Sequence, residues 1–213
     1  PNLYQHMDPM LVGNDMRLLV SDMAGRASIE LKGRELGFDL SDDKTLLTRI
    51  TNRVKDLESR GYTFEAADAS FELLLTEEVE GTRPSYVEIE SWRVITDSKP
   101  GDEAVSEATI KLRAGGARII TTGEGNGPVN ALDQALRAAL NGHFPALEHI
   151  HLVDFRVRVL DTSTGTEAVT RVLIETSDGE ESWFTVGVSE NVIEASWMAL
   201  LDALVFGLQR TTK

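Results

Sequence analysis

Two loops, each followed by an apolar helical pattern, are the segments of this sequence best suited to bind a ligand. The first reads GEGNGPVN at 123–130, where Pro128 suits the first turn of a helix. The glycines of this loop permit positive φ angles and leave backbone N–H groups accessible, and Asn126 can cap the helix. An uncovered helix N-terminus attracts an anion such as a carboxylate. The spacing matches neither G-x-G-x-x-G nor a G-K-[ST] phosphate loop, so a small carboxylate fits better than a dinucleotide.

The second loop, GVSENVIE at 187–194, carries side chains where the first has glycine. Glu190 or Asn191 offers a partner for an ammonium group, while amides of the first loop would hold a carboxylate. Together the loops suggest a site for a small zwitterion where two helix N-termini converge. A plainer interpretation is that both are tight turns into well-capped helices, with Asn191 and Glu194 as a capping-box-like pair.

Other residues with chemical potential are scattered along the chain. Tyr4, His6 and Asp8 lie in a proline-bounded segment and are types that serve acid–base chemistry. His149 and His151 share a strand face at a spacing that can bind metal, but no third ligand is near in sequence. Exposure to solvent is the simpler explanation for both groups. No nucleophile–base pair, paired-carboxylate motif or metal cluster occurs, so we expect no metal site, and the residues alone indicate a ligand-binding or assembly module.

Composition narrows the possible partners and compartment. The 213 residues allow one large or two small domains, and the net charge of -14 argues against nucleic acid and anionic membranes as partners. The lack of cysteine excludes disulfides, thiolate metal sites and a cysteine nucleophile, and fits a cytoplasmic protein. No apolar run approaches the roughly 20 residues that span a bilayer. No signal peptide opens the chain, and because its first residue is not Met we expect a piece of something longer.

Hydrophobic periodicity predicts a helical part followed by a part rich in strands. Residues 1–24 combine an irregular polar segment with a short apolar one, and residues 25–80 have helical spacing. The predicted helices are one ended by Gly37, one from Asp42 or Asp43 to Arg60, and one capped by Thr63. We expect the last two to form an antiparallel pair because their turn is short. The stretch at 80–85 has the composition of a linker.

Beyond that linker the sequence describes one structural unit used twice. The segment 123–140 aligns without a gap with 187–204, and six of the eighteen positions are identical. Alternating strands and hairpin turns at Ala114–Gly116 and Asp178–Gly179 precede the two helices. Each unit, at 84–144 and 148–209, is therefore predicted to be three strands and a helix. Neither can bury its sheet face alone, so we expect the two to pack around a pseudo-twofold axis. The alanine ridge that both helices share marks close helix contact, in the core or across a dimer: Ala131, Ala135, Ala139, Ala195, Ala199 and Ala203.

The motif TGEGNGPVNALDQAL resembles the G-x-G-P-v-[DN]-A signature of the C-terminal regulatory domain of 2-isopropylmalate and citramalate synthases. The second copy matches the second half of that domain, and NLYQHMDPMLVGNDMRLLVSDMAGRASIELKGRELG resembles the linker of the citramalate branch. The resemblance implies an α+β fold: residues 1–24 end a first linker subdomain, 25–80 form a helical second one, and 81–213 form the regulatory domain of two βββα units.

The resemblance also implies a function for the longer enzyme. Such enzymes are acyltransferases that condense acetyl-CoA with a 2-keto acid on a barrel holding a divalent metal. That barrel would precede Pro1, so the present chain should be inactive alone and needs no cofactor. For the citramalate branch the keto acid is pyruvate and the product feeds isoleucine synthesis. Tyr4 matches a family tyrosine that reaches the partner subunit's active site, whereas His6 has no obvious family counterpart.

The family's regulatory domain forms a homodimer and binds isoleucine or leucine as a feedback inhibitor near the dimer interface. We expect isoleucine; leucine, with a 2-isopropylmalate synthase as parent, is the close alternative, and a stand-alone amino-acid-binding dimerisation module is the rival from another class. The predicted lining consists of Gly125, Gly127, Pro128, Ala131, Leu152, Phe155, Val169, Ser189, Glu190 and Asn191.

Overall fold

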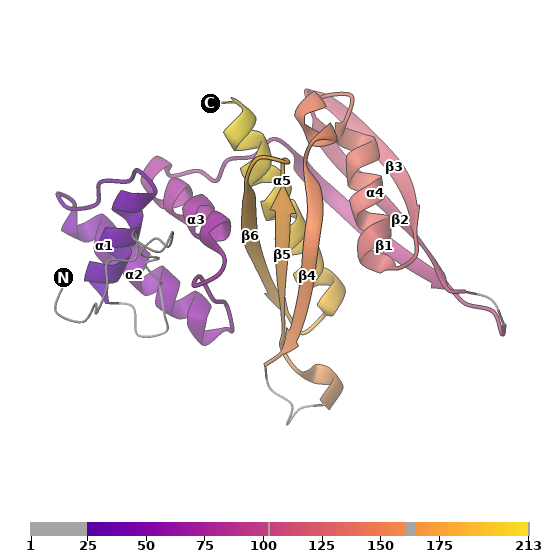
Figure 1. Cartoon of the computed structure of the whole chain (residues 1–213), viewed down its shortest axis with the longest axis horizontal. Coiled ribbons are helices and arrows are strands. Elements are labelled where there is room, and N and C mark those ends of the chain that lie inside the picture. The colour runs from indigo at the N-terminus through magenta and orange to yellow at the C-terminus, as the bar shows by residue number, and fades with distance from the viewer. Residues whose placement is uncertain (1–24, 102, 161–164, 213) are drawn as a thin grey trace, which may run out of the picture.

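The computed structural model describes residues 25–101, 103–160 and 165–212. The chain is an α+β structure in layers, as predicted (Figure 1). A helical unit comes first, made of α1 (Arg26–Glu35), α2 (Lys44–Ser59) and α3 (Asp68–Glu80). The first βββα unit contains β1 (Glu88–Asp97), β2 (Val105–Ala114), β3 (Ala117–Gly125) and α4 (Pro128–Leu140). The second contains β4 (His151–Val159), β5 (Thr170–Ser177), β6 (Ser182–Ser189) and α5 (Val192–Thr212).

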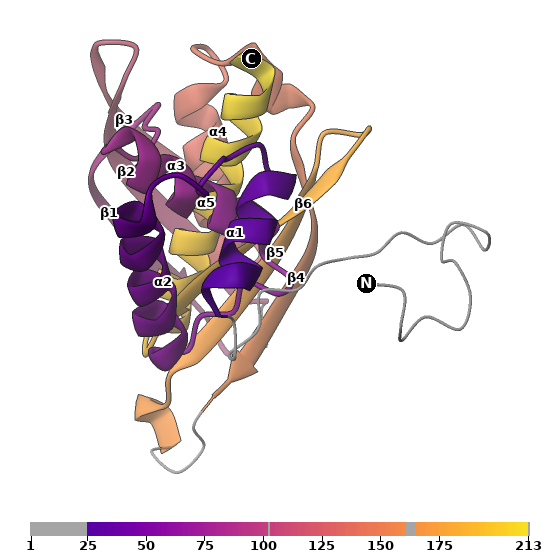
Figure 2. The same ribbon diagram turned by 90° about the vertical axis from the view of Figure 1, so that its left-hand side faces the viewer.

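The two βββα units pack with their helices facing inward. Each sheet is antiparallel, in the orders β1-β2-β3 and β4-β5-β6, and α4 and α5 lie between the sheets (Figure 2). The alternate residues of β2 and β5 that face the helices are buried, as a half-covered strand requires. The second sheet is covered on both faces, because α3 also packs on β6.

Matching details in the two units confirm the internal repeat. A bulge interrupts β1 between Ile89 and Ser91, and another interrupts β4 between Leu152 and Asp154. The Thr121 hydroxyl donates to the carbonyl of Ala135 at 2.9 Å, and Thr185 donates to Ala199 at 2.8 Å. These are equivalent residues, 64 positions apart in the sequence. The repeat therefore preserves the contacts between helix and sheet as well as the order of elements.

Two glycines of the first loop, Gly123 and Gly125, serve close packing, which corrects their predicted role. None of Gly123, Gly125 and Gly127 has a positive φ. A Cβ added at Gly123 would lie 2.3 Å from the Ala135 backbone nitrogen. At the equivalent Gly187 it would lie 2.0 Å from the Ala195 carbonyl oxygen. Both glycines allow a helix to lie directly on its own sheet.

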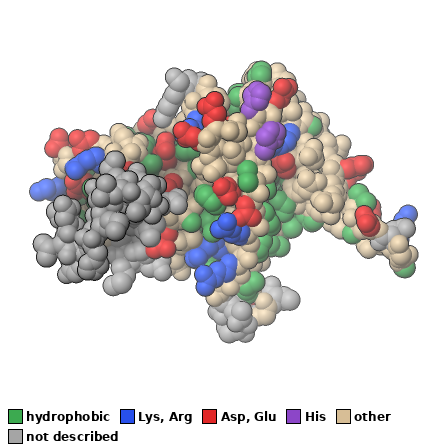
Figure 3. Space-filling model, viewed as in Figure 1, with side chains coloured by type: hydrophobic (Ala, Val, Ile, Leu, Met, Phe, Trp, Pro, Cys, Tyr) green, Lys and Arg blue, Asp and Glu red, His purple; other side chains and the backbone are tan. Residues whose placement is uncertain are grey.

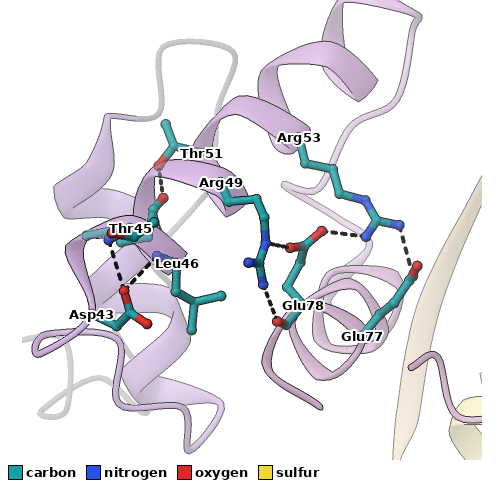
Figure 4. A network of polar contacts seen from close by, with 9 residues as sticks. Asp43, Thr45, Leu46, Arg49, Thr51, Arg53, Glu77 and Glu78 are labelled. Carbon is teal, nitrogen blue, oxygen red and sulfur yellow. Dashed lines mark hydrogen bonds and ion pairs between the residues drawn. The ribbon is translucent and has the colours of Figure 1, made fainter. Parts of the chain in front are cut away.

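The helical unit holds its own apolar core and a network of ion pairs. Asp43 caps α2 by accepting from the amides of Thr45 and Leu46, as predicted. α3 begins at Asp68, later than the predicted start after Thr63, because Phe64 and Ala67 are buried in a non-helical turn. Figure 4 shows how α2 and α3 are joined, through pairs of Arg49 with Glu78 and of Arg53 with Glu77 and Glu78.

The C-terminal helix corrects one expectation about apolar segments. By length and composition alone, α5 is apolar enough over Val192–Thr211 to cross a membrane. Its apolar side chains, however, pack against β5, β6 and α4 in the core of the protein. Burial among the other elements therefore accounts for the composition of α5.

Candidate functional site

An open groove of about 760 Å³ runs along α4 and reaches β4 of the other unit. Its volume is in the range of roughly 300–1,000 Å³ that is typical of ligand sites. We call this cavity the α4 groove. It is lined by Asn126, Gly127, Pro128, Val129, Asn130, Asp133, Gln134, Arg137, Asn141, Leu147, Glu148, His151, Leu152 and Phe155.

Arg137 joins the two walls of the α4 groove. Its Nε donates to both carboxylate oxygens of Asp133, at 2.9 and 3.0 Å, one turn earlier on α4. Its Nη1 donates to the carbonyl oxygens of Leu147 and Ile150, at 3.1 and 2.7 Å, in the segment leading into β4. Because its side chain is only 16% exposed and its Nε and Nη1 are bonded to the two walls, Arg137 fixes their relative position.

The backbone at the start of α4 is the part of the groove suited to a carboxylate. Gly127 is the residue before the helix and has no side chain to cap it. The first helical hydrogen bond is donated by Ala131 to Gly127, so the amides of Val129 and Asn130 have no acceptor within the helix. At the start of α5 the equivalent amides are capped, because the Asn191 side chain accepts from Ile193 at 2.9 Å and from Glu194 at 3.4 Å.

The rest of the α4 groove offers negative charge and apolar surface. Glu148 lines it, and so does Asp133, whose side chain is 12% exposed and whose two carboxylate oxygens accept from Arg137. Val129, Leu152 and Phe155 supply apolar surface. A groove with uncapped amides, carboxylates and apolar side chains matches the three parts of an apolar amino acid.

The structure divides the predicted lining between several places. Four of its residues, Gly127, Pro128, Leu152 and Phe155, line the α4 groove. Two lie at or beneath it: Ala131 is buried in the core, and a Cβ at Gly125 would lie 2.6 Å from the Ala131 nitrogen. The remaining four lie elsewhere, with Val169 packed against the helical unit and Ser189, Glu190 and Asn191 in the turn that caps α5. Within one chain the two loops therefore do not share a cavity, contrary to expectation.

The catalytic and metal candidates have different outcomes. Tyr4, His6 and Asp8 lie outside the described residues. His151 is exposed at the rim of the α4 groove, and His149 is an exposed residue that ends the short 3-10 turn Pro145–Glu148. Sequence reasoning missed Asp133, Arg137 and Glu148 as groove residues. The spacing of Asp133 and Arg137 on one helix face was a usable signal for the first two.

A second cavity of about 490 Å³ lies at the equivalent position on α5, and we call it the α5 groove. Asn130, Asp133, Gln134 and Arg137 of the α4 groove are equivalent to Glu194, Trp197, Met198 and Leu201 of the α5 groove, each pair being 64 residues apart. Phe155 and Trp92 are likewise equivalent, because they pair with Ile174 and Ile110 on the middle strands. Each groove thus includes residues from the helix of one unit and from the first strand of the other.

The fold and the α4 groove place this chain in the class of duplicated βββα modules with a groove at the junction of the repeats. More specifically, it belongs to the LeuA allosteric (dimerisation) domain family, which matches residues 65–208. The chain is 61% identical over 210 residues to an (R)-citramalate synthase of Streptomyces coelicolor, and 44% identical over 208 residues to one of Aquifex aeolicus. These alignments cover 99% and 97% of the chain.

A 2-isopropylmalate synthase of Aquifex aeolicus is more distant, at 31% identity over 205 residues and 94% of the chain. The chain spans 39% of the length of the two citramalate synthases and 36% of this protein. The resemblance read from the glycine-rich motif is thereby confirmed.

Proposed function

We propose that this chain is the linker and regulatory part of a cytoplasmic citramalate synthase and that it binds isoleucine in the α4 groove as a feedback inhibitor. The parent enzyme would condense acetyl-CoA with pyruvate. The similarity to (R)-citramalate synthases over nearly the whole chain supports the parent activity. The observation that carries the binding proposal is the uncapped start of α4 inside a groove that also presents carboxylates and apolar side chains.

The groove suggests how isoleucine would be held. The carboxylate would accept from the amides of Val129 and Asn130, where the helix dipole adds to the attraction. The ammonium group would lie toward Asp133 and Glu148, and the branched side chain toward Leu152 and neighbouring apolar groups. Leucine and isoleucine differ only in branching, so we expect a preference of about 1–3 kcal/mol at most.

The repeat itself supplies the sharpest test of this binding mode. Gly127→Asn places in α4 the residue that caps α5. A Cβ at Gly127 would meet no atom within 4 Å, and its extended φ of -172° suits any residue, so the fold should tolerate the change. The new side chain would occupy the amides and weaken isoleucine binding about 10- to 100-fold in isothermal titration calorimetry.

Gly142→Asn is the matched control, because a Cβ at Gly142 also meets nothing within 4 Å and Gly142 is outside the groove lining. Leucine and valine, titrated in parallel, report specificity. If titration with isoleucine gave equal heats for wild type and Gly127→Asn, the proposed position of the isoleucine carboxylate would be wrong. Tighter binding of leucine than of isoleucine would favour a 2-isopropylmalate synthase as parent.

We further propose that β4 carries the homodimer contact. It is an edge strand, and its residues on the α5 side are apolar and exposed: Phe155 (36% exposed), Val157 (46%) and Val159 (48%). Figure 3 shows apolar side chains along the middle of the face that carries β4. An exposed apolar edge is a ready surface for a second copy, and the chain contains a dimerisation domain.

Val157→Arg tests this contact through the molar mass measured by light scattering after gel filtration. The variant is expected to be monomeric. Ile120→Arg is the control, because Ile120 is similarly exposed (53%) but lies on the outer face of the other sheet. A dimeric Val157→Arg protein would exclude β4 as the contact.

Catalysis by the parent enzyme would take place outside the described residues. Within residues 25–101, 103–160 and 165–212, no group of three or more His, Asp or Glu residues is arranged to hold a metal. We propose that the divalent metal belongs to another part of the enzyme, and that Tyr4 acts at the active site of the partner subunit.

A further inference from the structure

We propose that the α5 groove is the docking surface through which the helical unit responds to a ligand in the α4 groove. This inference rests on the proposed binding of an amino acid to the α4 groove. It concerns a different cavity, whose lining comes from three parts of the chain: Arg53, Leu57, Tyr62, Phe64, Ser70 and Leu74 of the helical unit, Arg83 of the linker, and Trp92, Val186, Glu194, Trp197, Met198, Leu201 and Asp202 of the βββα units.

The helical unit is fixed at this groove by a polar clamp centred on Asp202. The Arg83 guanidinium donates to Asp202 Oδ1 at 2.6 Å, and the Ser70 hydroxyl donates to Oδ2 at 3.1 Å. The Ser70 oxygen also accepts from the backbone amide of Val186 at 3.0 Å. A single carboxylate on α5 thus holds both α3 and the linker. Its side chain is 18% exposed, so the bonds are largely shielded from solvent.

Equivalent positions in the two grooves differ in a way that suits different occupants. The α4 groove has Phe155 and Asp133 where the α5 groove has Trp92 and Trp197. The two tryptophan rings lie 5.9 Å apart between centroids and narrow the α5 groove. With its amides capped by Asn191, the start of α5 does not offer the carboxylate seat of α4.

The two grooves share the junction between the βββα units, and this couples them. In the α5 groove, Trp92 comes from the first unit and Trp197 from the second. In the α4 groove, α4 comes from the first unit and Phe155 from the second. Any displacement of one unit against the other therefore changes the shape of both grooves. A cavity of about 490 Å³ remains between the helical unit and the βββα units, so the two surfaces do not meet in full contact there.

Intrinsic fluorescence can follow this coupling directly. The chain has three tryptophans, and Trp183 lies apart from both grooves against Phe206. In the Trp183→Phe variant of the 213-residue chain, Trp92 and Trp197 are the only tryptophans, and both lie in the α5 groove. Titration with isoleucine should change the emission of these two tryptophans. The midpoint of that change should equal the midpoint measured by calorimetry on the same variant. Circular dichroism establishes that the variant is folded.

Thermodynamic reciprocity gives the second measurement. If the grooves are coupled, loosening the clamp by Asp202→Asn must change the isoleucine dissociation constant, by about fivefold or more for a typical coupling. Arg83→Gln loosens the same clamp and serves if Asp202→Asn does not fold. Arg49→Gln is the matched control, because Arg49 pairs with Glu78 inside the helical unit and should leave the constant unchanged.

The outcomes separate this inference from the proposed function. The coupling would be wrong if isoleucine gave binding heats without changing tryptophan emission, and if both clamp variants had the same isoleucine dissociation constant as wild type. That result would leave the proposed ligand site intact. The coupling would also be wrong if Arg49→Gln changed the isoleucine dissociation constant as much as the clamp variants do. Absence of binding for isoleucine, leucine and valine would overturn the proposed function and the coupling together.

Discussion

The close approach of each helix to its own sheet predicts a specific sensitivity at two glycines. Gly123→Ala would place a Cβ 2.3 Å from the Ala135 nitrogen and 2.7 Å from the Ala131 oxygen. Gly187→Ala would place one 2.0 Å from the Ala195 oxygen and 2.9 Å from the Ala199 nitrogen. These are backbone atoms of helices, so no side-chain rotation can relieve the overlap.

The expected cost follows from overpacking. Inserting a methyl group into a packed core costs typically 1–3 kcal/mol, and in a protein of this size 1 kcal/mol lowers Tm by about 2–4 °C. Each variant should therefore melt about 2–12 °C below wild type in scanning calorimetry. Because the two sites lie in different units, the double variant should show about the sum of the two losses.

Gly142→Ala is the control for the loss of glycine flexibility. A Cβ at Gly142 meets no atom within 4 Å, and its φ is not positive, so Tm should stay within about 1–2 °C of wild type. If Gly123→Ala and Gly187→Ala also melted that close to wild type, the helices would not lie as near their sheets as the structure has them.

Three further predictions test other contacts. Thr185→Val removes the buried hydroxyl that donates to Ala199 and should lower the free energy of unfolding by about 0.5–1.5 kcal/mol in urea titrations, more than Thr121→Val, whose hydroxyl is only partly buried. Burial raises the pKa of Glu78, but hydrogen bonds from Arg53 and Arg49 outweigh burial and hold that pKa below its ordinary value. The stabilisation is therefore present above the ordinary pKa and is lost as pH falls through the lowered one, so Glu78→Gln should flatten the acid limb of Tm against pH. Tyr4→Phe in the full-length enzyme should lower turnover in an acetyl-CoA consumption assay and leave inhibition by isoleucine unchanged; unchanged turnover would remove Tyr4 from the mechanism.

Local sequence signals predicted the elements well where the deciding contacts are local. Asp43 caps the helix that follows it, and Pro128 lies in the first turn of α4, because both effects act within one turn. The repeat was visible because the contacts of Gly123 and Gly187 with their helices require the same residues twice. The predicted start of α3 was wrong because Phe64 reaches the core from a turn. This tertiary contact overrides the capping tendency of Thr63.

The groove was only half predictable for the same physical reason. Its first wall is a loop and helix contiguous in sequence, so Gly127 and Pro128 could be found. Its second wall comes from β4 of the other unit, and its position depends on the bonds of Arg137 to the carbonyls of Leu147 and Ile150. Sequence periodicity assigns faces to strands but does not state which helix a strand of another unit will meet. The expectation of one shared cavity failed at this point.

Two differences between the repeats concern the start of the helix and the lining of the groove. Where α4 begins after Gly127, α5 begins after a capping Asn191; where the α4 groove has Asp133, the α5 groove has Trp197. The first difference leaves the amides at the start of α4 without a side-chain cap, and the second replaces a carboxylate by an indole ring. Gly123 and Gly187, which let each helix lie on its own sheet, are identical in the two copies, whereas these positions beside the grooves differ. One copy is therefore suited to a small polar ligand, and the other to the protein's own helical unit.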